Sequence, residues 1–395
     1  MDNYQIRMLN RIAAEGIALF GEGYGLDNHG LPPDALIVRS AQLDTADYPS
    51  ILAVARAGAG VNNITVAKAT EAGVCVFNTP GANANAVAEL VFVMLGIAVR
   101  KILGGIEFVR GLAGLDDKEL SRQVEERKAA FKGFELAGKT LGVLGLGKIG
   151  VRVANGGIER RMRVLGFDPY PAMENIHQLS PEVEYVRNRA EVVRQANVLS
   201  IHMPYSEKTR HLVNAELIRQ LPKGATLVNY ARGAIVDEQA VLAALDSGQL
   251  DHYLTDFPSV ALLAHPKVFA TPHLGASTEE SEEQCAIMAV NELKGFLEYG
   301  NVSHSVNFPT VESIPADNAH TRLTMVNRDV PGMIGLASRI IGAHNINITS
   351  YLNESTGVIG YNIIDLESPI ADAVLDEIRA QPGVIRLRTI TIDKN

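Results

Sequence analysis

The chain has few of the residues that build disulfide frameworks and metal sites. It contains no tryptophan and only two cysteines in 395 residues, Cys75 and Cys285. They lie far apart without metal-ligand spacing, which argues against a disulfide framework and against a zinc site. The sequence therefore predicts no bound metal and a location in the reducing cytoplasm.

The chain also lacks an excess of positive charge and a long hydrophobic run. Its net charge of -9 argues against a nucleic-acid partner held through phosphate contacts, although local basic sites for small anions remain open. The longest apolar segment, Ala86 to Val99, contains Glu89 and is shorter than the roughly 20 residues that a membrane span needs. The N-terminus shows scattered charges and no signal-peptide pattern. We expect a globular protein that binds neither nucleic acid nor membrane.

Short apolar runs alternate with helical stretches almost to residue 300. The length suggests about two to four domains. Apolar runs that end in Gly, Pro or polar residues are typical of buried strands, and helices between them indicate parallel sheets covered on both faces. We predict two doubly wound α/β domains of Rossmann or flavodoxin type, with strands at 35–40, 51–58, 74–80, 140–147, 163–169, 197–204, 225–233 and 267–273.

Two long helical patterns connect these strands. The first, residues 83–111, begins with asparagines able to cap it and is a plausible crossover between domains. The second follows Ser277, which lies in capping-box spacing with Glu280, and continues as an amphipathic helix to Gly300. It is expected to return the chain to the first domain.

The pattern of predicted elements changes after residue 309. A polar, proline-containing linker is followed by elements in the order strand, helix, strand, strand, helix, strand. That βαββαβ order is typical of a ferredoxin-like module. The predicted strands are 321–327, 346–352, 357–366 and 384–393, and the predicted helices are 332–343 and 370–380.

The strongest local motif is GVLGLGKIG, which follows a strand and opens a helix. Its G-x-G-x-x-G glycines are Gly145, Gly147 and Gly150. They allow a tight turn, close approach of a pyrophosphate and close helix–strand packing, and Asp168 ends the next strand, placed to bind a ribose hydroxyl. An acid there selects NAD over NADP. Gly156 and Gly157 would weaken the helix by about 1 kcal/mol each, and a plain strand–helix turn is the alternative interpretation.

Arg232 and His273 each follow a predicted strand and therefore lie at the carboxyl edge of a sheet, where ligands bind in open α/β folds. A guanidinium can hold a carboxylate and polarise an adjacent carbonyl, and an imidazole can act as an acid or base. The alternatives are a surface arginine that caps the next helix and a core histidine bonded to a backbone carbonyl. Two such residues on one edge favour catalysis.

Further basic residues suit an anionic substrate. Arg39 and Arg56 end two strands of the first domain, and two arginines that converge on a cleft would suit a carboxylate and a phosphate. Structural salt bridges are the competing interpretation. Arg127 and Lys132 lie in a basic linker. They either reach a neighbouring site or are simply solvated, and the sequence favours the second interpretation.

Together these stretches resemble the D-2-hydroxyacid dehydrogenase family, and within it the branch that acts on 3-phospho-D-glycerate. The motifs occur in order along nearly the whole chain: LIVRSAQL, ARAGAGVNNI, VFNTPGANANAVAEL, GKTLGVLGLGKIG, FDPY, LSIHMP, LVNYARGAIVDE, TPHLGAST and VNRDVPGMIG. The resemblance implies NAD-dependent oxidation to 3-phosphohydroxypyruvate, the first step of L-serine biosynthesis. In such enzymes a histidine takes the hydroxyl proton, an arginine binds the substrate's carboxylate and carbonyl, and a glutamate pairs with the histidine.

The resemblance implies a role for each matching residue. His273 and Arg232 take the catalytic roles, and substrate contacts fall on Arg39, Arg56, Ala59 and Gly60. Cofactor contacts fall on Gly145, Gly147, Lys148, Ile149, Gly150, Asp168, His202, Pro204, Ala231, Arg232, Asp256, His273 and Ala276. The implied domains are a discontinuous substrate-binding domain (1–85 and 277–308), an NAD-binding domain (86–276) and a regulatory ACT domain (318–395).

The C-terminal module resembles an ACT domain, which in related dehydrogenases binds L-serine between two paired modules. Asn327, Asp329 and Asn347 fall at positions expected for effector contacts. Asn327 stands where the best-known serine-inhibited pattern has a histidine, so a module used only for subunit pairing is the alternative. A homodimer or homotetramer is expected.

One residue departs from the family pattern. The glutamate that pairs with the histidine lies in a DVF-x-x-EP stretch, whereas this chain reads TDFPSVALL and has Val260 at that position. Three interpretations stay open: Asp256 substitutes for it, Glu279 or Glu280 reaches back, or His273 works without a carboxylate. The departure keeps two alternatives open: a dehydrogenase for another D-2-hydroxy acid, and an NAD-binding regulatory scaffold with vestigial catalysis.

Overall fold

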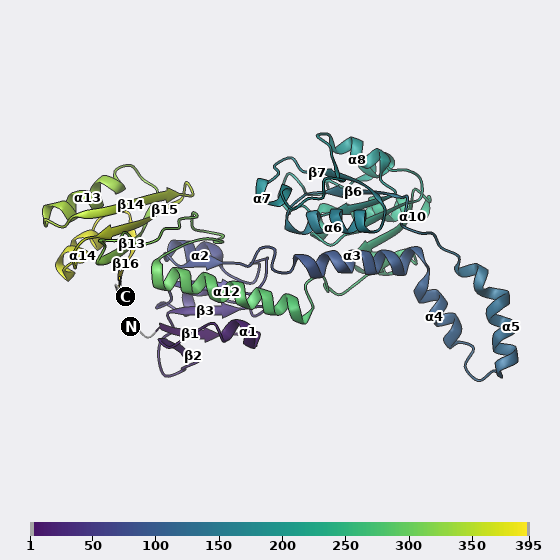
Figure 1. The fold of residues 1–395 in the computed structure, drawn as a ribbon, viewed down its shortest axis with the longest axis horizontal. Coiled ribbons are helices and arrows are strands. Elements are labelled where there is room, and N and C mark those ends of the chain that lie inside the picture. The colour runs from purple at the N-terminus through teal and green to yellow at the C-terminus, as the bar shows by residue number, and fades with distance from the viewer. Residues whose placement is uncertain (1–3, 393–395) are drawn as a thin grey trace. The chain divides into compact units, whose positions relative to one another are not determined.

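The computed structural model describes residues 4–392 and divides the chain into two compact units (Figure 1). One unit combines the residues up to Ala82 with those from Glu279 onward, and the other runs from Asn83 to Thr278. The first unit contains a five-stranded parallel sheet and a four-stranded antiparallel sheet, and the second contains a seven-stranded parallel sheet. These three sheets confirm the predicted α/β class with its ferredoxin-like C-terminal module.

The five-stranded sheet has the order β2-β1-β3-β4-β5. All of β3 and most of β4 are buried, as their apolar runs predict. β1 and β2 are additions to the prediction, because Gln5 and Arg7 interrupt β1 and β2 has only three residues. The strands are β1 Tyr4–Met8, β2 Tyr24–Leu26, β3 Ala35–Val38, β4 Ala53–Arg56 and β5 Cys75–Phe77.

Helix α12 is the main cover of this sheet. It begins two residues after Ser277 and carries Cys285, Ala289, Leu293 and Phe296 into the same core as the strands. It belongs to the same compact unit as the N-terminal strands. The helical elements of this part are α1 Ala14–Ile17, η1 Thr45–Asp47, α2 Val66–Glu71 and α12 Glu279–Tyr299.

The seven-stranded sheet has the order β12-β11-β10-β9-β6-β7-β8, and all its paired strands are parallel. Its strands are β6 Thr140–Leu144, β7 Arg163–Phe167, β8 Glu184–Tyr185, β9 Val198–Ile201, β10 Ala225–Asn229, β11 Leu250–Thr255 and β12 Val268–Ala270. The helices between them are α6 Lys148–Glu159, α7 Met173–Ile176, α8 Arg189–Gln195, α9 Ala215–Arg219, η3 Gly233–Ile235, α10 Glu238–Asp246 and α11 Val260–Leu263.

The two glycines inside α6 have a packing role. A Cβ at Gly156 would lie 2.6 Å from the Phe92 ring of α3 (Ala84–Val99), and one at Gly157 would lie 2.7 Å from Leu141 of β6. Larger residues would therefore push α6 away from both neighbours. The helix-propensity cost seen in the sequence is offset by this close approach.

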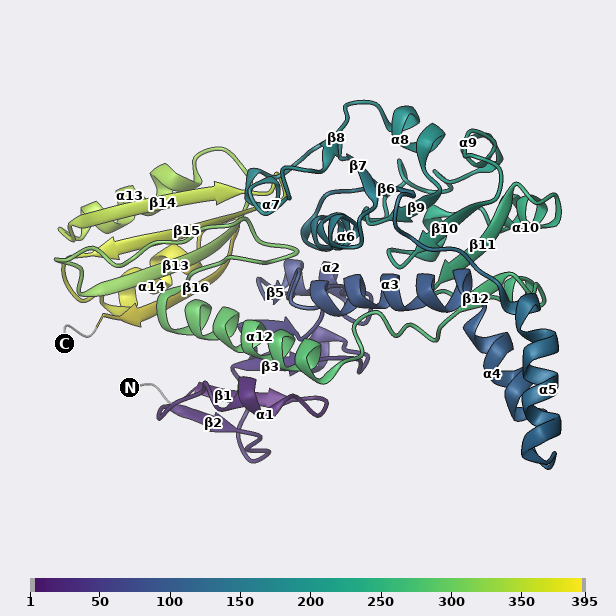
Figure 2. The same ribbon diagram turned by 45° about the vertical axis from the view of Figure 1, so that its right-hand side comes forward.

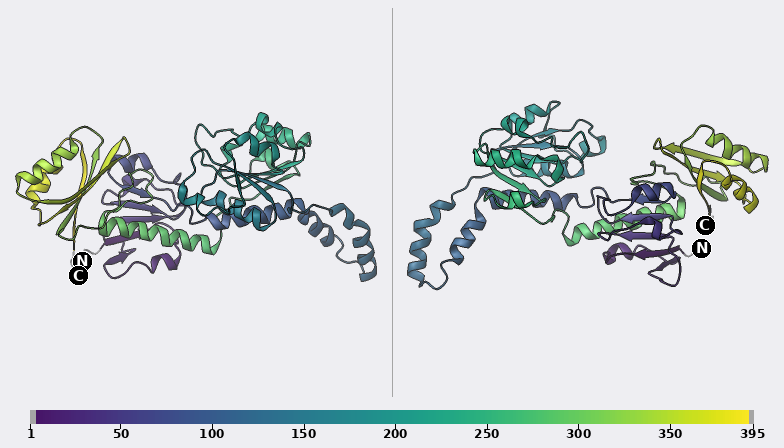
Figure 3. Two further views of the ribbon diagram at one scale, coloured as in Figure 1. Left: turned by 45° about the horizontal axis from the view of Figure 1, so that its top comes forward. Right: turned by 180° about the vertical axis from the view of Figure 1, so that it is seen from behind.

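The first helical crossover differs from the prediction in two ways. Lys101, at a positive φ of 51°, breaks it into α3 and α4 (Ile102–Arg110), and the side chain of Asn83 makes no capping hydrogen bond, so that part of the prediction is wrong. α5 (Asp117–Arg127) and η2 (Lys128–Phe131) follow, and the α4–α5 pair projects from the body of its unit (Figure 3). Arg127 lies over the Phe108 ring, 5.6 Å from its centroid.

The C-terminal sheet has the order β14-β15-β13-β16 with antiparallel pairing throughout. Figure 2 shows it with α13 and α14. Leu323, Ile364 and Leu387 pack against these helices, whereas Val326 and Tyr361 on the other face join the core of the five-stranded sheet. The elements are β13 Thr321–Arg328, α13 Met333–Ala343, β14 Ile348–Ser355, β15 Ile359–Leu366, α14 Asp372–Arg379 and β16 Val384–Thr391.

Side-chain donors fasten this module to the C-terminal end of α12. Arg388 donates to the carbonyls of Phe296 (2.6 Å) and Leu297 (3.2 Å), and Tyr361 donates to the carbonyl of Gly300 (2.6 Å). The Phe296 carbonyl also accepts from the N–H of Gly300 (2.9 Å), and the Leu297 carbonyl from the hydroxyl of Tyr4 (2.8 Å), so the module adds hydrogen bonds to carbonyls at the end of the helix. The module and α12 therefore form one packed body. Between residues 4 and 392, no helix combines the length and apolar character needed to cross a membrane.

Candidate active site

The glycine loop between β6 and α6 is shaped by two close backbone approaches. Gly145 has a φ of 96°, and a Cβ there would lie 2.6 Å from the carbonyl oxygen of His202. A Cβ at Gly150 would lie 1.8 Å from the carbonyl oxygen of Gly145. A Cβ at Gly147, in contrast, would meet no atom within 4 Å. The first and third glycines are needed to form the turn, and the second leaves open space over it.

Asp168, directly after β7, reaches across to this loop. Its Oδ2 accepts a hydrogen bond from the backbone N–H of Leu146 (2.8 Å), and its Oδ1 accepts one from Tyr170 (2.8 Å). A carboxylate oxygen can accept more than one hydrogen bond, so both oxygens remain able to bind hydroxyl groups. Lys148 and Ile149 form the first turn of α6 beside them.

His202 lies under the same loop, directly after β9. Its Nε2 is 2.7 Å from the hydroxyl oxygen of Ser200, and burial lowers the pKa of the imidazole to about 3. The ring is therefore neutral at physiological pH. Its Nδ1 is buried without a hydrogen-bond partner among residues 4–392, which marks a polar atom that a ligand at this edge could satisfy. Pro204 follows in the same loop and accepts a hydrogen bond from Thr209 (2.9 Å).

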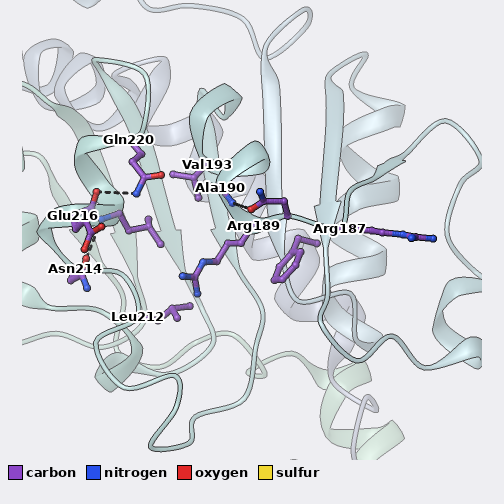
Figure 4. Close-up of a pocket in the computed structure, with 11 residues that line it drawn as sticks. Arg187, Arg189, Ala190, Val193, Leu212, Asn214, Glu216 and Gln220 are labelled. Carbon is purple, nitrogen blue, oxygen red and sulfur yellow. Dashed lines mark hydrogen bonds between the residues drawn. The ribbon is translucent and has the colours of Figure 1, made fainter.

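A pocket of 410 Å³ opens next to the Asp168 side of this edge (Figure 4). Its walls combine apolar side chains with arginine, asparagine and glutamate side chains from the starts of α8 and α9. No motif in the sequence predicted it. It is lined by Phe167, Arg187, Asn188, Arg189, Ala190, Val193, Leu212, Asn214, Glu216, Leu217 and Gln220.

Arg232 follows β10, and the buried side chain of Asn229 fixes the turn that carries it. Asn229 Oδ1 accepts from the N–H of Ala231 (3.1 Å), and its Nδ2 donates to the carbonyl of Arg232 (3.0 Å). The Arg232 side chain is exposed, with Nη1 donating to the carbonyl of Ala231 (2.7 Å). The turn is thus rigid while the guanidinium remains accessible. Sequence reasoning missed Asn229, although an amide at a strand end is a recognisable signal.

His273 follows β12 on the same edge and has an unusual backbone. Its φ is 58°, and its N–H donates to the carbonyl of Thr271 (2.9 Å). The imidazole is exposed and meets the Phe257 ring edge-on, with centroids 5.3 Å apart. Phe257 also lies 3.1 Å from the Cβ position of Gly233, so this ring connects the turn of Arg232 to His273.

Asp256, after β11, binds the backbone around His273 and not its ring. Its carboxylate accepts from the N–H groups of Leu274 (2.9 Å) and Gly275 (2.7 Å) and from the hydroxyl of Thr271. Within the unit of residues 83–278, no carboxylate is hydrogen-bonded to or paired with His273. The expectation that Asp256 replaces the glutamate on the imidazole therefore needs correction, because its oxygens are directed at the loop.

The other residues considered for the missing partner are Val260 and two glutamates. Val260 opens the short helix α11 and is 90% exposed, and its side chain has no group that could accept a hydrogen bond from the imidazole. Glu279 and Glu280 form the start of α12 in the other unit. Ala276 lies between His273 and that helix and is half-buried.

Arg39 and Arg56 meet at the carboxyl edge of the five-stranded sheet. Arg56 is paired in register with Val38, and its Nε donates to the carbonyl of Arg39 (3.0 Å). The Arg39 guanidinium in turn pairs with Glu282 in the first turn of α12. Ala59 and Gly60 follow β4, and the carbonyl of Ala59 accepts from the Asn78 side chain (2.6 Å). The structure thus brings both arginines together, with a carboxylate beside one of them.

Asn10 organises this edge and was not identified from the sequence. Its Oδ1 accepts hydrogen bonds from three consecutive backbone N–H groups, those of Arg39 (3.0 Å), Ser40 (3.1 Å) and Ala41 (3.0 Å). Consecutive N–H groups that point at one acceptor form a nest. A single asparagine in the N-terminal segment gave no signal of this long-range contact.

The three predicted effector residues do not converge within one C-terminal module. Asn327 is buried and bonded to Asn362 (2.7 Å), and the carboxylate of Asp329 accepts from Ser355 (2.6 Å), at the end of the sheet where β15 begins. Asn347 donates to Glu367 (2.9 Å), just beyond the other end of β15. The eight residues of β15 separate the two ends by about 25 Å.

The chain is similar to known dehydrogenases of 2-hydroxy acids. Residues 105–275 match the family model described as D-isomer specific 2-hydroxyacid dehydrogenase, NAD binding domain. The D-3-phosphoglycerate dehydrogenase of Methanocaldococcus jannaschii is 36% identical over 288 residues, which cover 70% of this chain and 52% of that protein. The chain therefore spans about half the length of the first curated relatives that it matches.

Shorter relatives are matched over most of their length. The D-3-phosphoglycerate dehydrogenase of Haemophilus influenzae is 31% identical over 87% of this chain and 82% of its own length. The hydroxypyruvate reductase of Thermotoga maritima is 36% identical over 66% of this chain and 83% of its own. Among solved structures, NAD+-bound 3-phosphoglycerate dehydrogenase from Entamoeba histolytica matches 77% of this chain and 99% of that chain, with a TM-score of 0.60 and 27% identity.

Proposed function

We propose that this chain, which belongs to the D-isomer-specific 2-hydroxyacid dehydrogenase family, oxidises 3-phospho-D-glycerate to 3-phosphohydroxypyruvate with NAD, the first step of L-serine biosynthesis. The observation that carries the redox part is the carboxyl edge of the seven-stranded sheet, where the glycine loop, Asp168, Arg232 and His273 all lie. The paired arginines at the edge of the other parallel sheet support a phosphorylated acid.

The residues of this edge fit a dinucleotide. The space over Gly147 leaves room for a pyrophosphate at the start of α6, and Asp168 would accept hydrogen bonds from the adenosine ribose. His202 Nδ1 would gain a partner, and the 410 Å³ pocket beside Phe167 would receive the adenine end. Because a carboxylate at Asp168 repels a 2′-phosphate, NAD is favoured over NADP. Bound NAD supplies the acceptor for the hydride that leaves C2.

The chain's own side chains carry the rest of the chemistry. Arg232 binds the substrate carboxylate and the C2 oxygen, which stabilises the carbonyl as it forms. A ring nitrogen of His273 takes the proton of the C2 hydroxyl as the C–H bond breaks. Arg39 and Arg56, with the backbone of Ala59 and Gly60, hold the remaining anionic group of the substrate. Among residues 4–392, no group of three or more His, Cys, Asp or Glu side chains is arranged to hold a metal ion.

NADH formation with a panel of acids tests this proposal. We expect 3-phosphoglycerate to be preferred over glycerate, lactate and 2-hydroxyglutarate, and His273→Gln and Arg232→Ala to lower kcat/KM about 100- to 10,000-fold. Lys223→Ala, which removes an exposed cation at the opposite end of β10, serves as the control. Preference for an unphosphorylated acid would favour the dehydrogenase alternative, and NAD binding without turnover on any acid would favour the regulatory scaffold.

We further propose that two copies pair and that the C-terminal modules bind L-serine between them. α4 presents four exposed apolar side chains on its projecting hairpin, which suit a second copy: Ile102, Leu103, Ile106 and Val109. Two-fold pairing of the modules would set Asn347 of one copy near Asn327 and Asp329 of the other, which the single module separates. Light scattering is expected to give the mass of two or four chains, and a monomer would contradict the pairing. L-serine is expected to raise the Tm, and an unchanged Tm would contradict serine binding.

A further inference from the structure

The carboxylate of Asp256 is the centre of a buried hydrogen-bond cluster beneath His273. Asp256 is 2% exposed, and its three donors are the hydroxyl of Thr271 and the N–H groups of Leu274 and Gly275. These donors flank His273 on both sides in the sequence. The carboxylate therefore fixes the backbone before and after the histidine while leaving the imidazole itself unbonded.

We propose that Asp256 is a positioning residue for the redox reaction. It orients the His273 imidazole by holding the Thr271–Gly275 loop, and so replaces a carboxylate that would bind the ring directly. This inference rests on the proposed function, because it takes His273 to be the group that moves the proton. It assigns to backbone geometry the task that the glutamate at the position of Val260 would have performed through the imidazole.

The backbone conformation of His273 explains why such a brace is needed. A residue other than glycine at a φ of 58° costs about 1 to 2 kcal/mol relative to the right-handed region. The loop would relax from that conformation without contacts that fix it. Three hydrogen bonds to one buried charge provide these contacts, since bonds to an ionised acceptor are about twice as strong as neutral ones.

The surroundings of Asp256 are fitted to this arrangement. A Cβ at Gly275 would lie 3.0 Å from Oδ2, so a side chain there would press on the carboxylate. The Tyr230 ring is buried nearby, and burial together with the charge of Asp256 raises the pKa of its phenol, so the ring stays neutral. Phe257, the next residue along the chain, holds the imidazole from the side. The ring is thus oriented by its backbone and by one aromatic contact.

Three variants separate a loop brace from the other roles open to Asp256. Asp256→Asn introduces an amide whose N–H groups face the donors of the loop, so the loop should shift. We expect kcat to fall about 100-fold, which is the effect of displacing a catalytic group by about 1 Å. Thr271→Val removes one donor but keeps the Asp256 charge and should lower kcat about 10-fold. Thr271→Ser retains the hydroxyl and should restore activity. The Kd for NAD should stay within about twofold, and the acid limb of the kcat/KM profile should not move.

Two results would overturn the inference. If Asp256→Asn shifts the acid limb while Thr271→Val has no effect, the carboxylate acts on the imidazole. If the Kd for NAD rises while kcat at saturating NAD is unchanged, Asp256 is a cofactor contact. Amide hydrogen exchange at Leu274 and Gly275 gives a readout that needs no turnover, and Asp256→Asn should accelerate it. Unchanged exchange would refute the role of Asp256 in holding the loop. Faster exchange in a protein that shows no turnover would support that role and reject the proposed reaction.

Discussion

Replacing Asp365 with alanine should lower the free energy of unfolding by about 3 to 5 kcal/mol, because it would strand a buried guanidinium. Arg322 is fully buried and pairs with Asp365 through two hydrogen bonds, Nε to Oδ1 (2.7 Å) and Nη2 to Oδ2 (3.0 Å). Its Nη1 donates to the carbonyls of Tyr299 (2.9 Å) and Ser313 (3.0 Å). Losing the carboxylate thus also loosens the junction between the C-terminal module and α12.

Urea unfolding monitored by circular dichroism and tyrosine fluorescence measures this effect. Asp376→Ala is the matched control, because it removes a carboxylate from the exposed Arg379–Asp376 pair of α14. Exposed pairs contribute little, so this variant should unfold close to the wild type. If both substitutions lower the midpoint equally, the buried pair does not hold the module in place.

Substitutions at two glycines of one motif should separate folding from cofactor binding. Gly150→Ala places a methyl group 1.8 Å from the carbonyl oxygen of Gly145, so α6 must move, at about 1 to 3 kcal/mol or more. Gly147→Ala meets no atom and has an ordinary φ of -74°, so the fold should lose no more than about 1 kcal/mol at this N-cap. A methyl group that faces a pyrophosphate should still weaken NAD binding about 10- to 200-fold.

Tm and NAD titration, measured on the same samples, test both variants. Gly150→Ala should lower both the Tm and NAD affinity, and Gly147→Ala only the affinity. Gly21→Ala, where a Cβ also meets no atom, is the control in the other unit and should change neither. Normal NAD affinity in Gly147→Ala would mean that the dinucleotide does not lie over this loop.

Much of the fold could be predicted because buried strands have an unambiguous pattern. ALIV in β3 and LGVL in β6 are continuous apolar runs, and both are buried as expected. β8 was missed because its two residues are both exposed and carry no such pattern. The capping role of Asn83 was also predicted wrongly, since residue type alone does not decide whether a side chain turns toward the helix N-terminus.

The site shows a similar limit. The position of Arg232 and His273 at the carboxyl edge could be predicted, because a residue that follows a parallel strand must lie there, whatever its side chain does. The direction of the Asp256 carboxylate, the three bonds to Asn10 and the pairing of Arg39 with Glu282 depend on residues distant in the sequence. Such contacts are set by tertiary packing, and local pattern does not contain them.

The way the C-terminal module is attached to α12 limits how the chain can be divided. The half-buried Arg388 and the buried Tyr361 donate to carbonyls at the end of that helix, and the Phe308 and Tyr361 rings lie 5.4 Å apart in a shared core. A gene fragment that stops before the module would lose those hydrogen bonds and would expose that apolar surface to water. The C-terminal module therefore cannot be exchanged by itself, and a chimera that replaces it would also have to include the last turn of α12.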